Sequence, residues 1–199
     1  MMLDVMMYRG RRLVLAAAAA SVVLSVTVAA ETRQIDTAQS KLTVSVYKSG
    51  LFSGFADDHI IDAPIASGTV SDASPLSVAI EVHAGDLKVR DPNLSASKRD
   101  EVQKRMAGPE VLDTQTFPSI AFESTAIQPN GADRWAVTGR LTIHGQTRPV
   151  TFATTLANGR YRGTVALKQR DFGITPISIA GGTIKVKDEL KIEFDIVAR

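Results

Sequence analysis

Apolar and polar residues alternate at every second position in several stretches of the chain, and this period limits the fold more than any other feature. In one stretch, Val78, Ile80 and Val82 alternate with an alanine, a glutamate and a histidine. Successive side chains of a β-strand point to opposite faces, so such a stretch predicts a half-buried strand of an antiparallel sheet. The same period recurs over residues 42–47, 120–124, 137–143 and 190–197, and turn-forming residues stand at 129–131, 144–145, 158–159 and 181–182.

One segment has the period of a helix instead. Ser97 followed by Asp100 is typical of a helix N-terminus, Val102 and Met106 lie one turn apart, and Gly108 with the following proline ends the pattern. We predict a short α-helix near 97–107. Its other side chains are mostly charged, which favours a solvated face; a lid over a cavity is the alternative.

Short strands with turns at similar spacing predict an all-β domain that is either a sandwich or a closed barrel. We find no interdomain linker or internal repeat after residue 30, so we expect a single domain over residues 31–199. A barrel of about eight strands either fills its interior with side chains or holds one small ligand.

The first 30 residues have the composition of a cleavable export signal. Three arginines between residues 9 and 12 precede an apolar run of sixteen residues from Leu13 to Val28, and small residues follow up to Ala30. We predict cleavage after Ala30. An uncleaved membrane anchor is the alternative, although the run is shorter than the roughly 20 residues that a span needs. The leader holds three arginines and one aspartate, so the rest of the chain has equal numbers of acidic and basic residues, which argues against nucleic-acid binding.

The sequence contains few residues suited to catalysis. It has no cysteine, which excludes disulfides, thiolate catalysis and cysteine-based zinc sites. Serine-hydrolase, dinucleotide and phosphate-loop motifs are also missing, so we expect no catalytic residue and no cofactor; the glycines of residues 49–54 indicate a bend between strands. His59 follows Asp57 and Asp58. Such a group could form a metal site or a proton relay, or it could be an ordinary polar loop. We expect no metal site, because the spacing of a known metal-binding motif is lacking.

Three stretches of the second half carry a family resemblance. They are residues 116–124 with Phe117-Pro118, residues 137–150 with the hairpin around Gly139, and residues 170–174 with Arg170 to Gly173. In this order they resemble the YceI-like family of bacterial periplasmic proteins. The resemblance implies a lipocalin-like antiparallel β-barrel that binds a polyprenyl lipid or an isoprenoid quinone, and it places the exported protein in the periplasm.

We nominate as the wall of an apolar channel the inward residues of the alternating strands, with a filled core as the alternative. They are Val44, Val46, Val78, Ile80, Val82, Phe122, Leu141, Ile143 and Phe152. His59 and Arg170 are candidate contacts for the ligand's head group, because arginine recognises anionic groups with a planar fork; a structural role at a strand end is the alternative for Arg170.

The expected function is therefore that of a carrier for an isoprenoid or other long-chain amphiphile, with transient membrane contact. Two alternatives stay open, an interaction module that partners a membrane protein and an enzyme that acts on a lipid head group. The sequence also leaves the oligomeric state open, with a homodimer among the alternatives.

Overall fold

The computed structural model describes residues 31–49, 58–182 and 184–199. The predicted export signal and the predicted glycine-rich bend after Ser49 lie outside these residues, as does Asp57. The described chain forms strands and one α-helix, joined in places by short 3-10 turns. The elements are β1 (Thr32–Gln34), β2 (Lys41–Ser49), β3 (His59–Asp62), β4 (Ile65–Ser71), β5 (Ser77–His83), β6 (Lys88–Val89), α1 (Ala96–Ala107), β7 (Ser119–Pro129), β8 (Arg134–Ile143), β9 (Gln146–Ala157), β10 (Arg160–Lys168), β11 (Ser178–Ile179) and β12 (Ile184–Ile196).

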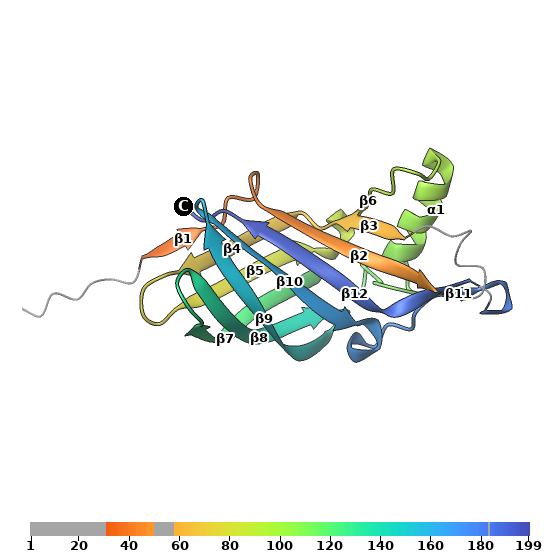
Figure 1. The fold of residues 1–199 in the computed structure, drawn as a ribbon. Helices are drawn as coiled ribbons and strands as arrows, with labels where there is room; N and C mark the ends of the chain where they lie inside the picture. The colour runs from red at the N-terminus through yellow and green to blue at the C-terminus, as the bar shows by residue number, and fades with distance from the viewer. Residues whose placement is uncertain (1–30, 50–57, 183) are drawn as a thin grey trace, which may run out of the picture.

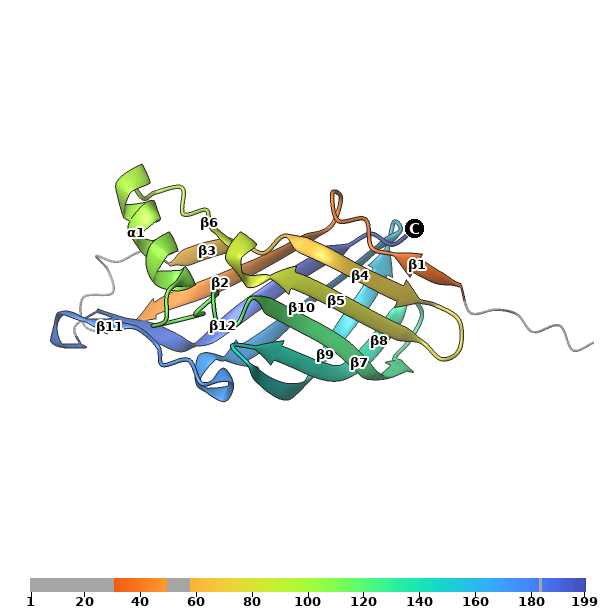
Figure 2. The same ribbon diagram turned by 180° about the vertical axis from the view of Figure 1, so that it is seen from behind.

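The strands form one antiparallel sheet, in the order β1-β4-β5-β7-β8-β9-β10-β12-β2-β3-β6. β3 and β4 are joined by Ala63 and Pro64 alone; β3 pairs with β2, whereas β4 pairs with β5. β3 and β4 lie near opposite ends of the strand order, and the short link between them brings these ends together, so the sheet curls into a barrel. Its walls are β2, β10 and β12 on one side and β4, β5 and β7 on the other (Figures 1 and 2). The predicted antiparallel lipocalin-like barrel with one helix is confirmed.

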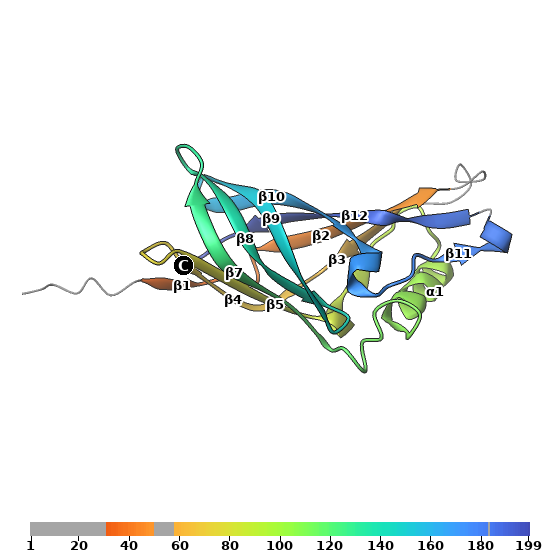
Figure 3. The ribbon, with the colours of Figure 1, turned by 90° about the horizontal axis from the view of Figure 1, so that it is seen from below.

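The two ends of the barrel differ. At one end, β1 pairs with β4, and the residues after β1 bond to the C-terminus through an Ile35–Ala198 bridge. At the other end lie α1 and β11 (Figures 1 and 3). The turns between β8 and β9 and between β9 and β10 have two residues each with positive φ, His144-Gly145 and Asn158-Gly159. Such turns match the twist of paired strands, as their sequence predicts.

The helix begins slightly earlier than its sequence pattern indicates. Ser95, not Ser97, caps α1, and its Oγ accepts a hydrogen bond from the backbone N–H of Lys98 at 3.4 Å. The capping pattern favoured Ser97, because an acid, Asp100, stands three residues later, whereas Lys98 stands three residues after Ser95. At the other end Gly108 donates to the carbonyls of Lys104 and Arg105, as expected of a helix C-cap.

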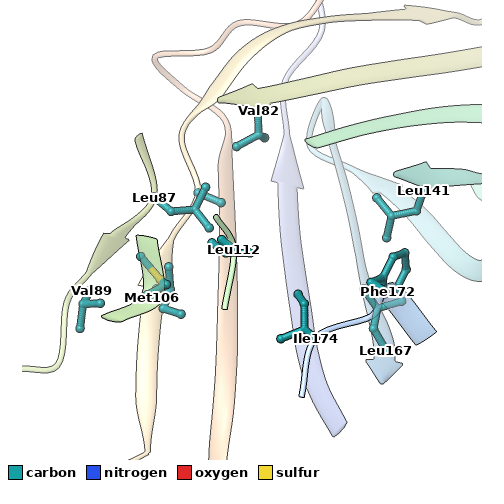
Figure 4. Packing of buried hydrophobic residues seen from close by; sticks show 11 residues of the cluster. Val82, Leu87, Val89, Met106, Leu112, Leu141, Leu167, Phe172 and Ile174 are labelled. Carbon is teal, nitrogen blue, oxygen red and sulfur yellow. The ribbon is translucent and has the colours of Figure 1, made fainter. Parts of the chain in front are cut away.

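A cluster of buried apolar side chains fills the middle of the barrel (Figure 4). Phe172 is only 2% exposed and packs in this cluster with Leu87, Leu112, Leu167 and Ile174. We call these five residues the waist. Gly173, with φ of 75°, ends the 3-10 turn that presents Phe172, so this glycine serves a left-handed turn.

Candidate functional site

The interior of the barrel holds an apolar cavity of about 180 Å³ between the waist and the β1 end. We call it the barrel cavity. Its wall comes from both sides of the sheet, and apolar side chains make up nearly all of it. The lining residues are Leu42, Val70, Ser71, Asp72, Leu76, Ser77, Val78, Ile80, Val82, Ile120, Phe122, Ile127, Trp135, Val137, Leu141, Val150, Phe152, Thr154, Tyr161, Val165, Ile192, Phe194 and Ile196.

Three phenylalanine rings form a row across one side of this cavity. The ring centroids of Phe122 and Phe152 lie 5.5 Å apart, and those of Phe152 and Phe194 lie 5.4 Å apart. The rings come from β7, β9 and β12, and a glycine stands on each strand between them, Gly139 on β8 and Gly163 on β10. A side chain on either glycine would collide with the neighbouring ring. The glycines therefore make room for the rings to lie against the barrel wall.

The few polar residues of the lining are either bonded within the protein or placed at its edge. Ser71 and Thr154 are buried, and their hydroxyls donate to the carbonyls of Ala73 and Arg162. Asp72 and Ser77 are exposed at the hairpin between β4 and β5. A ligand inside this cavity therefore meets apolar surface, and its binding depends on burial of its own apolar surface.

An amphipathic pair of aromatic residues stands on the strands at the β1 end. The rings of Trp135 and Tyr161 lie 6.1 Å apart, and both line the barrel cavity. Arg33 donates to the Tyr161 hydroxyl at 2.9 Å and pairs with Asp72 at 2.7 Å. These bonds hold polar side chains beside an otherwise apolar cavity.

A second cavity, of about 330 Å³, lies beneath α1 at the other end of the barrel. We call it the helix cavity. Its apolar lining is Val46, Ile61, Leu94, Val102, Met106, Val111, Ile177 and Val186, and its polar lining is His59, Lys98, Glu101, Arg105, Gln169 and Lys185. The helix therefore covers a cavity with the face that includes Val102, while Lys104 on the same helix is exposed and outside the lining. One face of the helix thus lines a cavity, as the lid interpretation expects, and another face is solvated.

The waist separates the two cavities. Val82 and Leu141 belong to the same buried cluster as the waist and line the barrel cavity, whereas Ile61 and Met106 belong to it and line the helix cavity. Figure 4 shows side chains of this cluster, among them Val82, Leu141 and Met106. The barrel is therefore filled in its middle and hollow on both sides.

A histidine–aspartate pair borders the helix cavity. The Nδ1 atom of His59 lies 2.6 Å from Oδ2 of Asp91, whose side chain is 2% exposed, and the backbone N–H of Ile60 donates to Oδ1 of Asp91. Asp58, the neighbour in sequence, instead accepts from the backbone N–H of Lys48. The partner of His59 thus comes from a segment 32 residues away, so the local spacing around His59 carried no signal for it.

The nominated channel residues divide among three places. Val78, Ile80, Val82, Phe122, Leu141 and Phe152 line the barrel cavity, and Val46 lines the helix cavity. Val44 and Ile143 line neither cavity and instead pack against the buried cluster between them. Period-two alternation identifies the inward face of a strand, but it does not tell which inward positions meet packed side chains.

The two candidate head-group residues lie in different places. His59 lines the helix cavity, but Arg170 lies on the surface outside both cavities. Asp188 accepts from the backbone N–H of Arg170 at 3.0 Å and lies 3.8 Å from its guanidinium. The structural role considered for Arg170, at the end of β10, is the one that this geometry supports.

Several lining residues were missed although their signal was present. Leu42, Ile120, Val137, Ile192, Phe194 and Ile196 stand in the alternating stretches that predicted strands. Trp135 and Tyr161 lie outside those stretches, and the register of the hairpins places them opposite Thr154 and Leu156. Cross-strand pairing, which sequence alone does not specify, brings these side chains to one cavity.

The other histidines have structural environments. The ring of His144 packs edge-on against Phe117 at 4.5 Å, and its Nδ1 lies 3.3 Å from the carbonyl oxygen of Phe172. His83 is exposed beside Asp86. In the part of the chain that the structure describes, no three His, Cys, Asp or Glu residues are grouped to hold a metal ion, and no helix is long and apolar enough to cross a membrane.

Comparison with known proteins finds one family. The model of the YceI-like domain matches residues 19–198. A UPF0312 protein of Pseudomonas putida strain W619 is 35% identical over 117 residues, which cover 53% of this chain and 57% of the relative. A UPF0312 protein of Yersinia pestis strain Pestoides F is 32% identical over 119 residues, which cover 55% and 58% of the two chains. The chain thus spans somewhat over half the length of these curated relatives, whose names state no reaction.

A solved structure shares the fold. The crystal structure of Burkholderia cenocepacia BcnA superimposes with a TM-score of 0.66 at 22% sequence identity, covering 83% of this chain and 99% of BcnA. At this identity the likeness supports the barrel architecture.

Proposed function

The chain belongs to the YceI-like family, and on that premise we propose that it binds a long apolar amphiphile whose chain end the barrel cavity encloses. The observation that carries the proposal is the lining of this cavity, where apolar side chains surround the space and the buried polar ones are bonded to the protein. A ligand recognised there is selected by its hydrocarbon surface. Polyprenyl lipids and isoprenoid quinones have such a chain.

The size of the cavity sets how much of the chain it encloses. A cavity of about 150 Å³ lined by apolar side chains holds benzene, so the 180 Å³ of the barrel cavity suits about one or two isoprene units. Each buried methylene contributes about 0.8 kcal/mol, and a five-carbon unit therefore contributes a few kcal/mol before the losses of binding. Micromolar affinity needs about 8 kcal/mol, so affinity should rise with each further unit that the protein covers.

A titration with isoprenoid alcohols of increasing length tests this proposal. Trp135 is the one tryptophan of the chain and lines the barrel cavity, so its fluorescence reports ligand entry there. We expect the fluorescence to change with geraniol, farnesol and geranylgeraniol, with no large gain in affinity beyond the chain length that fills the cavity. Solvent extraction of the freshly purified protein, followed by mass spectrometry, should release an isoprenoid.

A pair of variants on β10 provides the control. Val165 lines the cavity, and its neighbour Thr164 is exposed on the opposite face of the strand. Val165→Phe should abolish or greatly weaken uptake, whereas Thr164→Phe should leave it unchanged. A protein that releases no lipid and takes up none of the three alcohols would overturn the proposal. Co-purification of a membrane protein without lipid would point to the interaction module instead.

We also propose that the protein is exported to the periplasm and loses its leader, because residues 1–30 have the pattern of a cleavable signal. There an apolar-ligand carrier would move its ligand through water between membranes. N-terminal sequencing of the exported protein should begin at Glu31. Recovery of the intact leader on a membrane-bound protein would contradict cleavage and favour the anchor.

A further inference from the structure

The helix cavity differs from the barrel cavity in the chemistry of its wall. One side of it is apolar, with Val46 and Val186 from the barrel and Val102 from α1. The rest carries ionisable side chains, which the barrel cavity has only at its exposed edge. Its volume of about 330 Å³ lies at the lower end of the range for small-molecule sites, roughly 300–1,000 Å³. The wall thus suits a small molecule with an apolar part and a polar end.

Positive charge prevails among these ionisable groups. Among the described residues of the lining, Lys98 and Arg105 on α1 and Lys185 on β12 are cationic, and Glu101 is anionic. Arg105 already pairs with Glu110, at 3.6 Å. Lys98 and Lys185 have no ion pair among the residues that the structure describes, so their charges are available to a ligand. Lys98 stands on α1 and Lys185 on β12, so the two charges reach the cavity from different elements.

His59 adds a positioned hydrogen-bonding group. Buried Asp91 binds its Nδ1 atom and is itself fixed by the N–H of Ile60. In the described part of the chain the Nε2 atom of His59 has no polar partner, and His59 lines the cavity. A carboxylate that holds one imidazole nitrogen fixes the orientation of the ring and leaves the other nitrogen for a ligand.

We propose that the helix cavity is a second binding site, separate from the barrel cavity, for a small amphiphile that ends in a carboxylate or a phosphate. Lys98 and Lys185 balance its charge, His59 contacts its polar end, and its short apolar chain packs against the valines of the wall. The waist keeps this molecule apart from any chain in the barrel cavity. The site does not depend on what the barrel cavity binds.

Octanoate, octyl phosphate and octanol are suitable probes, because they share one chain and differ at the polar end. The chain has three histidines and one tryptophan, so NMR signals of the imidazole rings and of the Trp135 indole are few and assignable by substitution. We expect octanoate or octyl phosphate to shift the ring signals of His59 and to leave those of Trp135, His83 and His144 unchanged. The preferred anion shows which polar end the site takes. Octanol should bind at His59 at least about tenfold more weakly than that anion.

Substitutions of single lysines measure the role of charge. Lys98→Gln and Lys185→Gln should each weaken anion binding by about twofold to fivefold, as expected for partly exposed ion pairs. Lys104→Gln is the matched control, since Lys104 lies on the same helix but outside the cavity lining, and it should have no effect. Val102→Trp should block the site by filling it, with all charges retained. The unchanged Trp135 signal in each variant verifies the fold.

Three results would overturn the proposal. If octanoate and octyl phosphate shift the NMR signals of Trp135 but not those of His59, the binding lies in the barrel cavity. Octanol that binds as tightly as the anions would remove the role of the lysines. An absence of any shift at His59, in a protein that still takes up isoprenoid alcohols, would refute this second site and leave the proposed function standing.

Discussion

Replacement of Val165 by phenylalanine tests whether the barrel cavity is empty space. Val165 lies on β10 and lines this cavity, opposite Ile192 of β12. In a well-packed core an added ring forces neighbouring side chains and backbone to move, which costs about 1–3 kcal/mol. In an empty cavity the same ring finds room and buries new apolar surface. The sign of the stability change therefore distinguishes a hollow barrel from a filled one.

The size of the gain follows from the cavity. The substitution adds four carbon atoms, which contribute up to about 3 kcal/mol at 0.8 kcal/mol for each buried methylene. Incomplete burial and the ordering of the ring reduce this to about 1–2 kcal/mol. In a domain of this length, 1 kcal/mol shifts Tm by about 2–4 °C. We expect Val165→Phe to unfold about 2–8 °C above the unmodified protein in a circular-dichroism melt.

Val89→Phe is the matched comparison, because Val89 is 8% exposed in the buried cluster and lines neither cavity. It packs near Met106 beneath the helix (Figure 4), and it should lower Tm. If Val165→Phe lowers Tm as much as Val89→Phe does, the space beside Val165 is not available and the reasoning is wrong. The same variant would then also fail as a block on isoprenoid uptake.

Three further substitutions probe the packing and charge of the barrel. Phe172→Ala should cost about 3–5 kcal/mol in urea unfolding, because Phe172 is 2% exposed in the waist; a loss below about 1 kcal/mol would show that the waist is loosely packed. Gly163→Ala should lower Tm by several degrees, because the new Cβ would meet the Phe194 ring and lie 2.5 Å from the Ala153 carbonyl oxygen; an unchanged melt would contradict the close approach. Burial opposes ionisation of Asp195, but hydrogen bonds from two arginines outweigh it and lower its pKa, so its contribution to stability is present above the ordinary carboxyl pKa and is lost as pH falls through the lowered one. Asp195→Asn should therefore flatten the acid limb of the stability profile, and an unchanged limb in urea melts at several pH values would argue against this role.

Local periodicity predicted the strands because a half-buried strand leaves its signature in consecutive residues. The run from Val78 to Val82 forms most of β5, and Asn158-Gly159 forms the two-residue turn that such a pair favours. Closure of the barrel left no such signature. It depends on β3 and β4 pairing with different neighbours and on β1 reaching the C-terminus, which are contacts between distant segments.

The sequence also did not predict which inward residues border a cavity and which are packed in the core. Val44, Ile192 and Val165 lie side by side in one row across β2, β12 and β10. All three pack against the buried cluster, but only Ile192 and Val165 also line the barrel cavity. These three residues are chemically alike and all face inward, so only the side chains that reach them from across the barrel decide whether each borders a space.

Glycines at inward positions explain where the space arises. Along β10 the inward residues are Tyr161, Gly163, Val165 and Leu167. Tyr161 and Val165 line the cavity, and the larger Leu167 is buried in the waist. Gly163 contributes no side chain to the interior, and the Phe194 ring occupies the place that a Cβ there would take. Gly139 on β8 does the same for Phe122. The two glycines therefore leave room for the aromatic rings beside the wall of the cavity. An inward glycine on each of two nearby strands is the sequence signal that points to this arrangement.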